Sequence, residues 1–279
     1  MKLSSDIVGT EVGPIEQAID ARWLMAYSAA LGETDLRYYD TAASGGVMAH
    51  PVFPVCYEWP LALAMRDRAG LMPVYLRLVH ADHDLVVFRP LRAGDALQVR
   101  ARIVAVRSRK PGAYVVTRIE ASDATGALVT RSDYGSLYRG VALEGGDAGA
   151  DSGALEEIAA AADEFEPLGE VAVPANAAHV YSECARIWNP IHTDVAHARA
   201  AGLPGIILHG TATLALSVSR ILAVLGIEPA RVRRIRCRFS GMVPMPSTLS
   251  VRAARAKDAL HFEAWCGGGA ALSRGLLLQ

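Results

Sequence analysis

Apolar residues recur at helical spacing in two segments, each preceded by a side chain that can cap a helix. One segment covers residues 20–32 (DARWLMAYSAALG) and begins at Asp20, and the other (NAAHVYSECARI) begins at Asn176. Carboxylate and amide oxygens accept hydrogen bonds from the unpaired N–H groups at a helix N-terminus. The two patterns therefore predict two helices.

A second, more apolar helix is predicted after each of these. It covers residues 60–66 in the first half of the chain and residues 210–225 (GTATLALSVSRILAVL) in the second half. The segment in the second half is apolar on nearly all sides. This pattern is typical of a helix that its surroundings bury completely.

Apolar and polar residues alternate after each buried helix, over residues 97–103 and again over residues 249–252. A period of two indicates strands with one buried face. Predicted hairpins follow at residues 114–121 with 128–138, and at residues 261–266 with 271–278. Each half is therefore expected to be an antiparallel sheet wrapped around a helix.

The two halves also repeat one another in sequence. Residues 27–40 align with residues 181–194 at a constant offset of 154, which matches Tyr27 to Tyr181. Residues 88–97 (FRPLRAGDAL) match residues 239–249 (FSGMVPMPSTL) with one inserted residue. A duplicated structural unit explains this self-similarity.

Residues 144–166 (EGGDAGADSGALEEIAAAADEFE) consist mainly of Gly, Ala and acidic residues. Such a segment buries too little apolar surface to offset the entropy of ordering it, so it is predicted to be a linker. The predicted domains are therefore an N-terminal domain at 1–143 and a C-terminal domain at 167–279.

Composition excludes several classes of function. The 279 residues are 52% hydrophobic and carry a formal charge of −1, so the chain lacks the basic footprint of a nucleic-acid or anionic-membrane binder. Its four cysteines form no C-x-x-C pair, which argues against a zinc knuckle or a disulfide scaffold. The N-terminus lacks the apolar core of a signal peptide, and we expect a cytoplasmic protein.

The candidate chemistry is concentrated between residues 181 and 210. Asn189, Pro190, His192 and Asp194 lie within six residues, and an apolar run then ends in His209-Gly210. Histidine is the side chain best suited to move protons near neutral pH. Gly210 begins the predicted buried helix, where backbone N–H groups lack partners within the helix.

These motifs resemble a known family. N-P-I-H-T-D at 189–194, followed by A-R-A-A-G-L-P-G-I-I-L-H-G at 198–210, is similar to the MaoC-like hydratases and dehydratases. FRPLRAGDAL and residues 39–54 (YDTAASGGVMAHPVFP) resemble the N-terminal part of two-domain members. The resemblance implies an α+β double hot-dog fold, in which two antiparallel sheets each wrap a central helix and join as a pseudo-dimer. It also implies (R)-specific hydration of 2-enoyl thioesters and dehydration of 3-hydroxyacyl thioesters.

The same resemblance implies a role for each matching residue. His192 is the general acid or base, Asn189 orients the loop or a water, and the Gly210 amide is the oxyanion donor. His209 and Thr211 would contact the substrate, and Asp194 would cap the turn that follows it. Helix N-terminal amides suit the negative charge that builds on the thioester carbonyl oxygen, and no metal or organic cofactor is needed.

One position departs from the family, because the family's aspartate falls at Ile187. Losing one proton-transfer group lowers a rate by about a hundredfold to ten-thousandfold. Glu183 is one possible replacement, provided that the helix runs through to Ile187 so that the two residues share a face. Glu58, at the buried helix of the first half, is another if it crosses the pseudo-dimer.

The first half looks like a degenerate site that shapes the acyl pocket. It has Glu33 at the family's aspartate position, Tyr38 at the histidine position, and Val55 near the H-G position. His50 is a candidate for lining the pocket. His80 and His83 resemble a metal-binding pair only weakly, because no third ligand is in view.

Arginines in the predicted strand at 231–238 leave two interpretations open. Arg236 and Arg238 lie on one strand face and could meet the phosphates of coenzyme A, or they could protect a sheet edge from aggregation. The predicted partner is an acyl-CoA or acyl-carrier thioester, with neither nucleic acid nor membrane, and a homodimer of double hot dogs is possible. The rival functions are a thioester-binding accessory protein without turnover and an acyl-CoA thioesterase.

Overall fold

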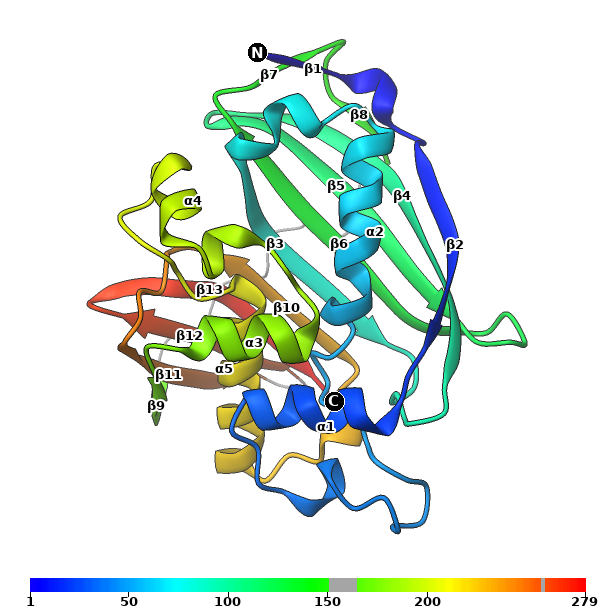
Figure 1. The fold of residues 1–279 in the computed structure, drawn as a ribbon, viewed down its shortest axis with the longest axis vertical. Coiled ribbons are helices and arrows are strands. Elements are labelled where there is room, and N and C mark those ends of the chain that lie inside the picture. Colours follow the sequence, from blue (N-terminus) through cyan, green and yellow to red (C-terminus); the bar gives the residue numbers. More distant parts are fainter. Residues whose placement is uncertain (151–164, 257–258) are drawn as a thin grey trace. The chain divides into compact units, whose positions relative to one another are not determined.

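A computed structural model describes residues 1–150, 165–256 and 259–279 (Figure 1). The chain forms two compact units, and neither is continuous in sequence. Among the described residues, the first unit holds Met1–Gln17, Tyr57–Phe88 and 96–150, and the second holds Ala18–Cys56, Arg89–Asp95, 165–256 and 259–279. None of the described helices is long and apolar enough to cross a membrane.

The first unit is an antiparallel sheet that faces one long helix. The order of its strands is β2 (Glu11–Ala18), β4 (Ala96–Arg109), β5 (Gly112–Ser122), β6 (Leu128–Arg139) and β3 (Leu78–Val87). Helix α2 (Val55–Arg68) lies across β5 and β6 (Figure 1), and Tyr57 reaches Thr130 on β6 with a hydroxyl–hydroxyl distance of 2.6 Å. Smaller elements complete the unit: β1 (Lys2–Ser4), η1 (Ser5–Ile7), η3 (Met72–Arg77), β7 (Ala142–Glu144) and β8 (Ala148–Gly149).

Helix α2 begins five residues before the predicted start at Pro60. Proline favours the first turn of a helix, so the sequence pattern pointed to Pro60 as the beginning. In the structure Pro60 lies inside the helix, and the preceding turn is held by packing because Val55, Cys56 and Tyr57 are all buried. Tertiary burial has overridden the local signal.

The second unit wraps its own sheet around the predicted central helix. The strands follow the order β10 (Arg234–Phe239), β13 (Gly269–Leu278), β12 (Ala259–Cys266), β11 (Ser247–Ala256) and β9 (Glu166–Val173). Helix α5 (Gly210–Leu225) lies against β9, β11 and β13 and has the predicted bounds. Eight of its sixteen residues are buried, as its apolar pattern predicts, but Ala223 and Val224 in its last turn are exposed, so the helix is not buried on all sides.

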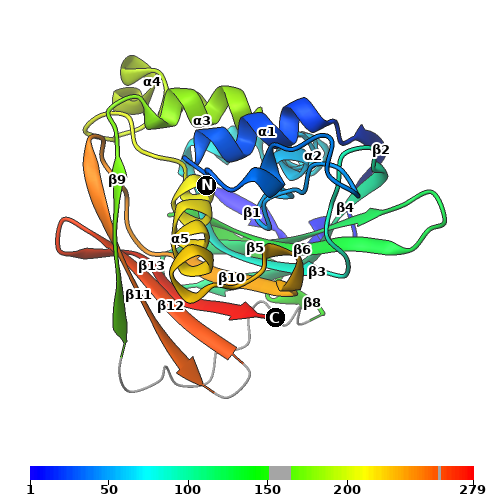
Figure 2. The ribbon, with the colours of Figure 1, turned by 90° about the horizontal axis from the view of Figure 1, so that it is seen from below.

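Two further helices of the second unit are related by the sequence repeat. These are α1 (Ala21–Ala30) and α3 (Ala177–Ala185), which lie side by side (Figure 2). Asp20 caps α1 as predicted by accepting a hydrogen bond from the Trp23 amide at 2.8 Å, whereas the Asn176 side chain makes no such bond to α3. The shorter helices are η2 (Leu36–Tyr38), η4 (Pro190–His192), α4 (Val195–Ala200) and η5 (Pro229–Arg231).

The repeat extends further than the sequence alignment showed. We call residues 20–51 the first copy and residues 176–210 the second copy. Isolated bridges join Met48 to Arg92 in the first copy and Ile207 to Pro244 in the second. This register makes His50 the counterpart of His209 and corrects the prediction that Val55 lies near that position. The sequence alignment lost register because α4 belongs to the second copy alone.

The interleaved units differ from the continuous domains expected at 1–143 and 167–279. Residues 18–56 and 89–95 pack with the C-terminal half of the chain rather than with the N-terminal half. The predicted linker at 144–166 begins with the described strand residues of β7 and β8, and residues 151–164 lie outside the described part of the chain. The linker thus stays a prediction.

Candidate active site

The loop that carries His192 starts where α3 ends. Arg186 adopts the left-handed conformation with φ 58°, and the Ile187 amide donates to the Ser182 carbonyl at 3.0 Å, so the helix stops after Ala185. The helix therefore does not run through Glu183 to Ile187, and the condition for their sharing a face is not met. Glu183 is exposed on α3, whereas Ile187 is buried.

The ring of His192 is held in one tautomer. Its Nδ1 lies 2.8 Å from the carbonyl oxygen of Ile207, which can only accept a hydrogen bond, so Nδ1 carries the proton. The other ring nitrogen, Nε2, then keeps its lone pair. Burial lowers the pKa of His192 to about 4, against the opposing effect of the Ile207 hydrogen bond. The imidazole is therefore neutral and basic at Nε2 at physiological pH.

His209 lies directly against His192. The two rings stack with their centroids 3.7 Å apart and their planes 26° apart. The Nε2–H of His209 points to the Ile187 carbonyl at 3.3 Å and to the Ser182 hydroxyl at 3.2 Å. Burial and then the neighbouring His192 lower its pKa well below the usual value, so this ring is also neutral.

The N-terminus of α5 begins beside these rings. The His209 carbonyl accepts from the Thr213 amide at 3.0 Å, which is the first hydrogen bond of the helix. The amides of the preceding turn, Gly210 among them, have no acceptor within the helix and offer partial positive charge. A side chain at Gly210 would not fit, because a Cβ there would lie 2.9 Å from the Phe239 ring.

Two polar residues of the loop have different surroundings. The Oδ1 of Asn189 is buried and has no hydrogen-bond partner among the described residues, so it is an open acceptor. Asp194 instead caps α4, accepting from the amides of Ala196 at 2.8 Å and His197 at 3.1 Å. Asp194 has the structural role that was predicted for it.

Comparison with known proteins now identifies the chain. Residues 170–269 match the family model described as MaoC like domain, and residues 6–132 match the one described as FAS1-like, dehydratase domain region. The chain thus combines a MaoC-like dehydratase domain with a FAS1-like dehydratase region. Its fold is likewise that of a MaoC-like dehydratase from Phytophthora capsici, with a TM-score of 0.82 at 21% identity over 98% of this chain and 95% of that one. The architecture is therefore the double hot-dog fold.

Several curated relatives match parts of the chain. The chain is 28% identical over 178 residues to peroxisomal multifunctional enzyme type 2 of Drosophila melanogaster, covering 63% of this chain and 30% of that enzyme. It shares the same identity, over 63% of the chain, with enoyl-CoA hydratase ChsH3 of Mycobacterium tuberculosis, of which it covers 60%. A UPF0336 protein of Streptomyces griseus is 31% identical over 46% of this chain and 90% of its own length.

In this MaoC-like protein the first copy holds a different set of side chains. His50 accepts a hydrogen bond from the Val52 amide at Nδ1 (3.2 Å), so Nε2 carries the proton and donates to the Ser219 hydroxyl at 3.2 Å. The Glu33 carboxylate lies 3.9 Å from Nε2 of His50. Burial lowers the pKa of His50 to about 3 and raises that of Glu33. Both ring nitrogens of His50 thus have internal partners.

Two predicted substrate contacts also have internal partners. Thr211 accepts a hydrogen bond from the Tyr181 hydroxyl at 3.2 Å, and that hydroxyl lies 3.4 Å from its repeat counterpart on Tyr27. His209 is held by Ile187 and Ser182, as described above. These hydrogen bonds fix the positions of the Thr211 and His209 side chains, and their contact with substrate stays a prediction.

Glu58 lies in the first unit and is buried there. Its carboxylate accepts a hydrogen bond from Ser132 and lies 3.5 Å from the Nε2 of His83, and its side chain is 2% exposed. Burial raises its pKa, with His83 and Ser132 opposing the shift. Glu58 is therefore a buried carboxyl with partners of its own, and a role opposite His192 stays a prediction.

The remaining predicted residues are on strands. Arg234, Arg236 and Arg238 share one face of β10 and alternate with the buried Ile235 and Cys237. Contact of Arg236 and Arg238 with phosphates stays a prediction. His80 and His83 lie on β3, and within the described residues no three His, Cys, Asp or Glu side chains gather as a metal site.

Sequence reasoning missed Ser182, Tyr181 and the Ile207 carbonyl as parts of the site. A signal was present for the first two, because the pair Tyr-Ser recurs at 27–28 and 181–182 in both copies. The hydrogen bond to Ile207 left no sequence signal, since any residue type supplies a carbonyl.

Proposed function

We propose that this protein catalyses the reversible hydration of a 2-enoyl thioester to a 3-hydroxyacyl thioester. The observation that carries the proposal is the tautomer of His192. Because Nδ1–H is committed to the Ile207 carbonyl, the lone pair at Nε2 remains to accept a proton. A neutral imidazole can take a proton from water in the step that forms the new C–O bond, although burial makes His192 a weaker base than a free histidine.

In the hydration direction, the thioester carbonyl accepts a hydrogen bond from the Gly210 amide. A water held by the free Oδ1 of Asn189 attacks C3 while Nε2 of His192 takes a proton from it. The electron pair of the C2=C3 bond moves toward the carbonyl, and its oxygen gains negative charge that the α5 N-terminus stabilises. Protonated His192 then gives a proton to C2 and returns to its neutral form.

This scheme uses one histidine for both proton transfers, because an apolar side chain stands where the family has an aspartate. Ile187 is buried, and its carbonyl holds His209 rather than a water. Glu183 and Glu58 are the candidates for a second acid. The exposure of Glu183 and the internal partners of Glu58 support the scheme with His192 alone.

The acyl carrier is coenzyme A or a protein-bound pantetheine. One relative is named an enoyl-CoA hydratase, and another is a fatty acid synthase beta subunit of Aspergillus oryzae, 41% identical over 96 residues. The two names support both kinds of carrier. The apolar side chain of Ile187, which stands where the family has an aspartate, favours one alternative function, which is thioester binding without turnover.

The experiment mixes the purified protein with crotonyl-CoA and with longer enoyl-CoA substrates and follows the loss of enoyl absorbance. We expect hydration by the wild type and a fall in kcat of about a hundredfold or more in H192N, whose amide can still bond the Ile207 carbonyl but has no basic nitrogen. The matched control is H179Q, because His179 is exposed on α3 and the longer amide can keep the hydrogen bond to the Thr193 carbonyl.

The outcomes separate the functions. Hydration that H192N leaves unchanged would refute the role of His192. Retained binding of CoA esters with no hydration of any substrate would favour the binding protein, and a growing free-thiol signal would indicate a thioesterase. A loss in E183Q or E58Q as large as that in H192N would identify a second acid and exclude the scheme with a single histidine.

A further inference from the structure

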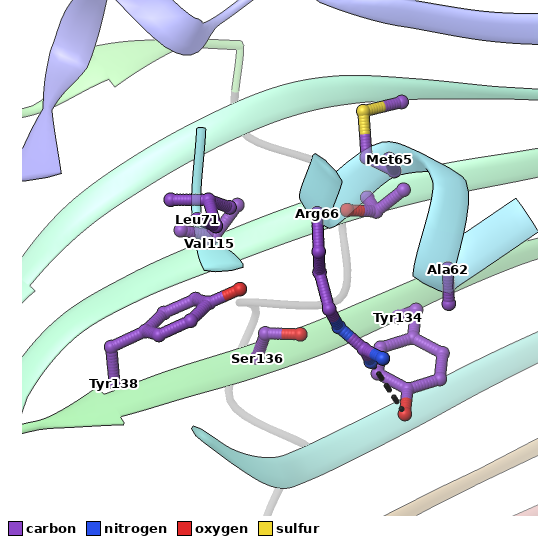
Figure 3. Close-up of a pocket in the computed structure, with 9 residues that line it drawn as sticks. Ala62, Met65, Arg66, Leu71, Val115, Tyr134, Ser136 and Tyr138 are labelled. Carbon is purple, nitrogen blue, oxygen red and sulfur yellow. Dashed lines mark hydrogen bonds between the residues drawn. The ribbon is translucent and has the colours of Figure 1, made fainter. Parts of the chain in front are cut away.

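A small hollow lies inside the first unit, between α2 and the inner face of β5 and β6 (Figure 3). Two periodicities build its wall. Residues three and four apart on α2 share one helix face, and alternate residues of each strand point to the same side of the sheet. All of the lining residues are buried. They are Ala62, Met65 and Arg66 of α2; Leu71, which follows α2; Val115 and Thr117 of β5; and Tyr134, Ser136 and Tyr138 of β6.

Arg66 brings a positive charge into this hollow. Its side chain extends from α2 to the Tyr134 hydroxyl, which lies 3.5 Å from Nη2 (Figure 3). The residue is 4% exposed. Its Nη1 has no hydrogen-bond partner, and no carboxylate forms an ion pair with it, anywhere in the part of the chain that the structure describes.

Aromatic rings surround the guanidinium without neutralising it. The rings of Trp59, Tyr75 and Tyr134 lie 5.4, 5.6 and 5.8 Å from its central carbon. Cation–π contacts offset only part of the loss of hydration that a buried charge suffers. In the same unit Arg118 shows the usual arrangement, with two hydrogen bonds of 2.8 Å to the Asp133 carboxylate.

We infer that this hollow binds the carboxylate group of a ligand. The free Nη1 of Arg66 supplies a charge-assisted donor, and the hydroxyls of Tyr138, Ser136 and Thr117 line the same space. The hollow has room for about one water molecule, so it admits a single carboxylate oxygen and not the rest of a ligand. The carboxylate belongs either to a carboxylated acyl thioester, a source that rests on the proposed function, or to a free small carboxylic acid.

Calorimetric titration of the full chain tests both sources without requiring turnover. The first arm compares saturated CoA thioesters that end in a carboxylate with methyl-ended thioesters of equal carbon number, from four to ten carbons. The second arm compares free carboxylic acids with the matching neutral amides. We expect the carboxylate to bind about tenfold or more tightly in at least one arm, as a charge-assisted hydrogen bond implies.

Three variants assign the preference to Arg66. R66M removes the charge at similar length and should abolish the preference, whereas R66K keeps a charge and should retain part of it. R68M removes an exposed charge from the same helix, at a residue that does not line the hollow, and should bind like the wild type. Equal binding of both members of every pair by the wild type would overturn the inference, as would a preference that survives in R66M.

The wild-type titrations decide the matter even where a variant does not fold, which its urea midpoint would reveal. A carboxylate preference in a protein that hydrates no enoyl thioester would support this inference while the proposed function fails. Hydration of an enoyl thioester by a protein that shows no carboxylate preference would support the proposed function and overturn this inference.

Discussion

Lowering the pH from 7.5 to 5 should destabilise this protein through its buried neutral histidines. Burial lowers the pKa of His50 to about 3 and that of His192 to about 4. In the unfolded chain each ring titrates near ~6.5. Between that value and the folded pKa, the unfolded chain binds a proton that the native state does not bind, so stability falls as the pH falls.

The magnitude follows from these values. At pH 5 an unfolded histidine is almost fully protonated, whereas His50 and His192 are still neutral in the native state. Each therefore lowers the free energy of unfolding by about 2 kcal/mol relative to pH 7.5. Burial raises the pKa of Glu33 and Glu58, so these carboxyls bind protons in the native state and act in the opposite direction. A variant must isolate the histidine contribution.

H50N is the sharpest variant, because an asparagine oxygen can replace Nδ1 as the acceptor for the Val52 amide. The assay is urea unfolding at pH 7.5 and pH 5. H50N should lose about 2 kcal/mol less stability than the wild type between the two pH values, whatever its stability at pH 7.5. H179Q changes an exposed histidine and should keep the wild-type difference. An equal loss in H50N and the wild type would refute the reasoning.

Two further substitutions test the supports of the site. D194A should lower the free energy of unfolding by about 1 kcal/mol in urea titrations because it removes the cap of α4, while D194N should keep most of it; equal stability of D194A and the wild type would contradict the capping role. G210A should cost about 1 to 3 kcal/mol by overpacking against the Phe239 ring, and adding F239L should recover part of this loss; a G210A variant as stable as the wild type would show that the ring moves freely.

Local patterns were sufficient where one segment carried the whole signal. The apolar run of α5 predicts a largely buried helix without reference to other segments, and Asp20 lies beside the free amides of α1 that it caps. The start of α2 could not be predicted, because Pro60 carries a strong local signal and the packing of the preceding turn overrides it. The relation of His50 to His209 was hidden because α4 shifts the register of the repeat.

The sequence by itself determined the duplication, the central helix of each half and the residue types available for chemistry, since the order of residues along the chain carries all of these. The tertiary structure alone decided that residues 18–56 pack with the C-terminal half. It also decided the proton position on His192 and the missing partner of Arg66. Hydrogen bonds and burial set these properties, and they come from residues that only folding brings together.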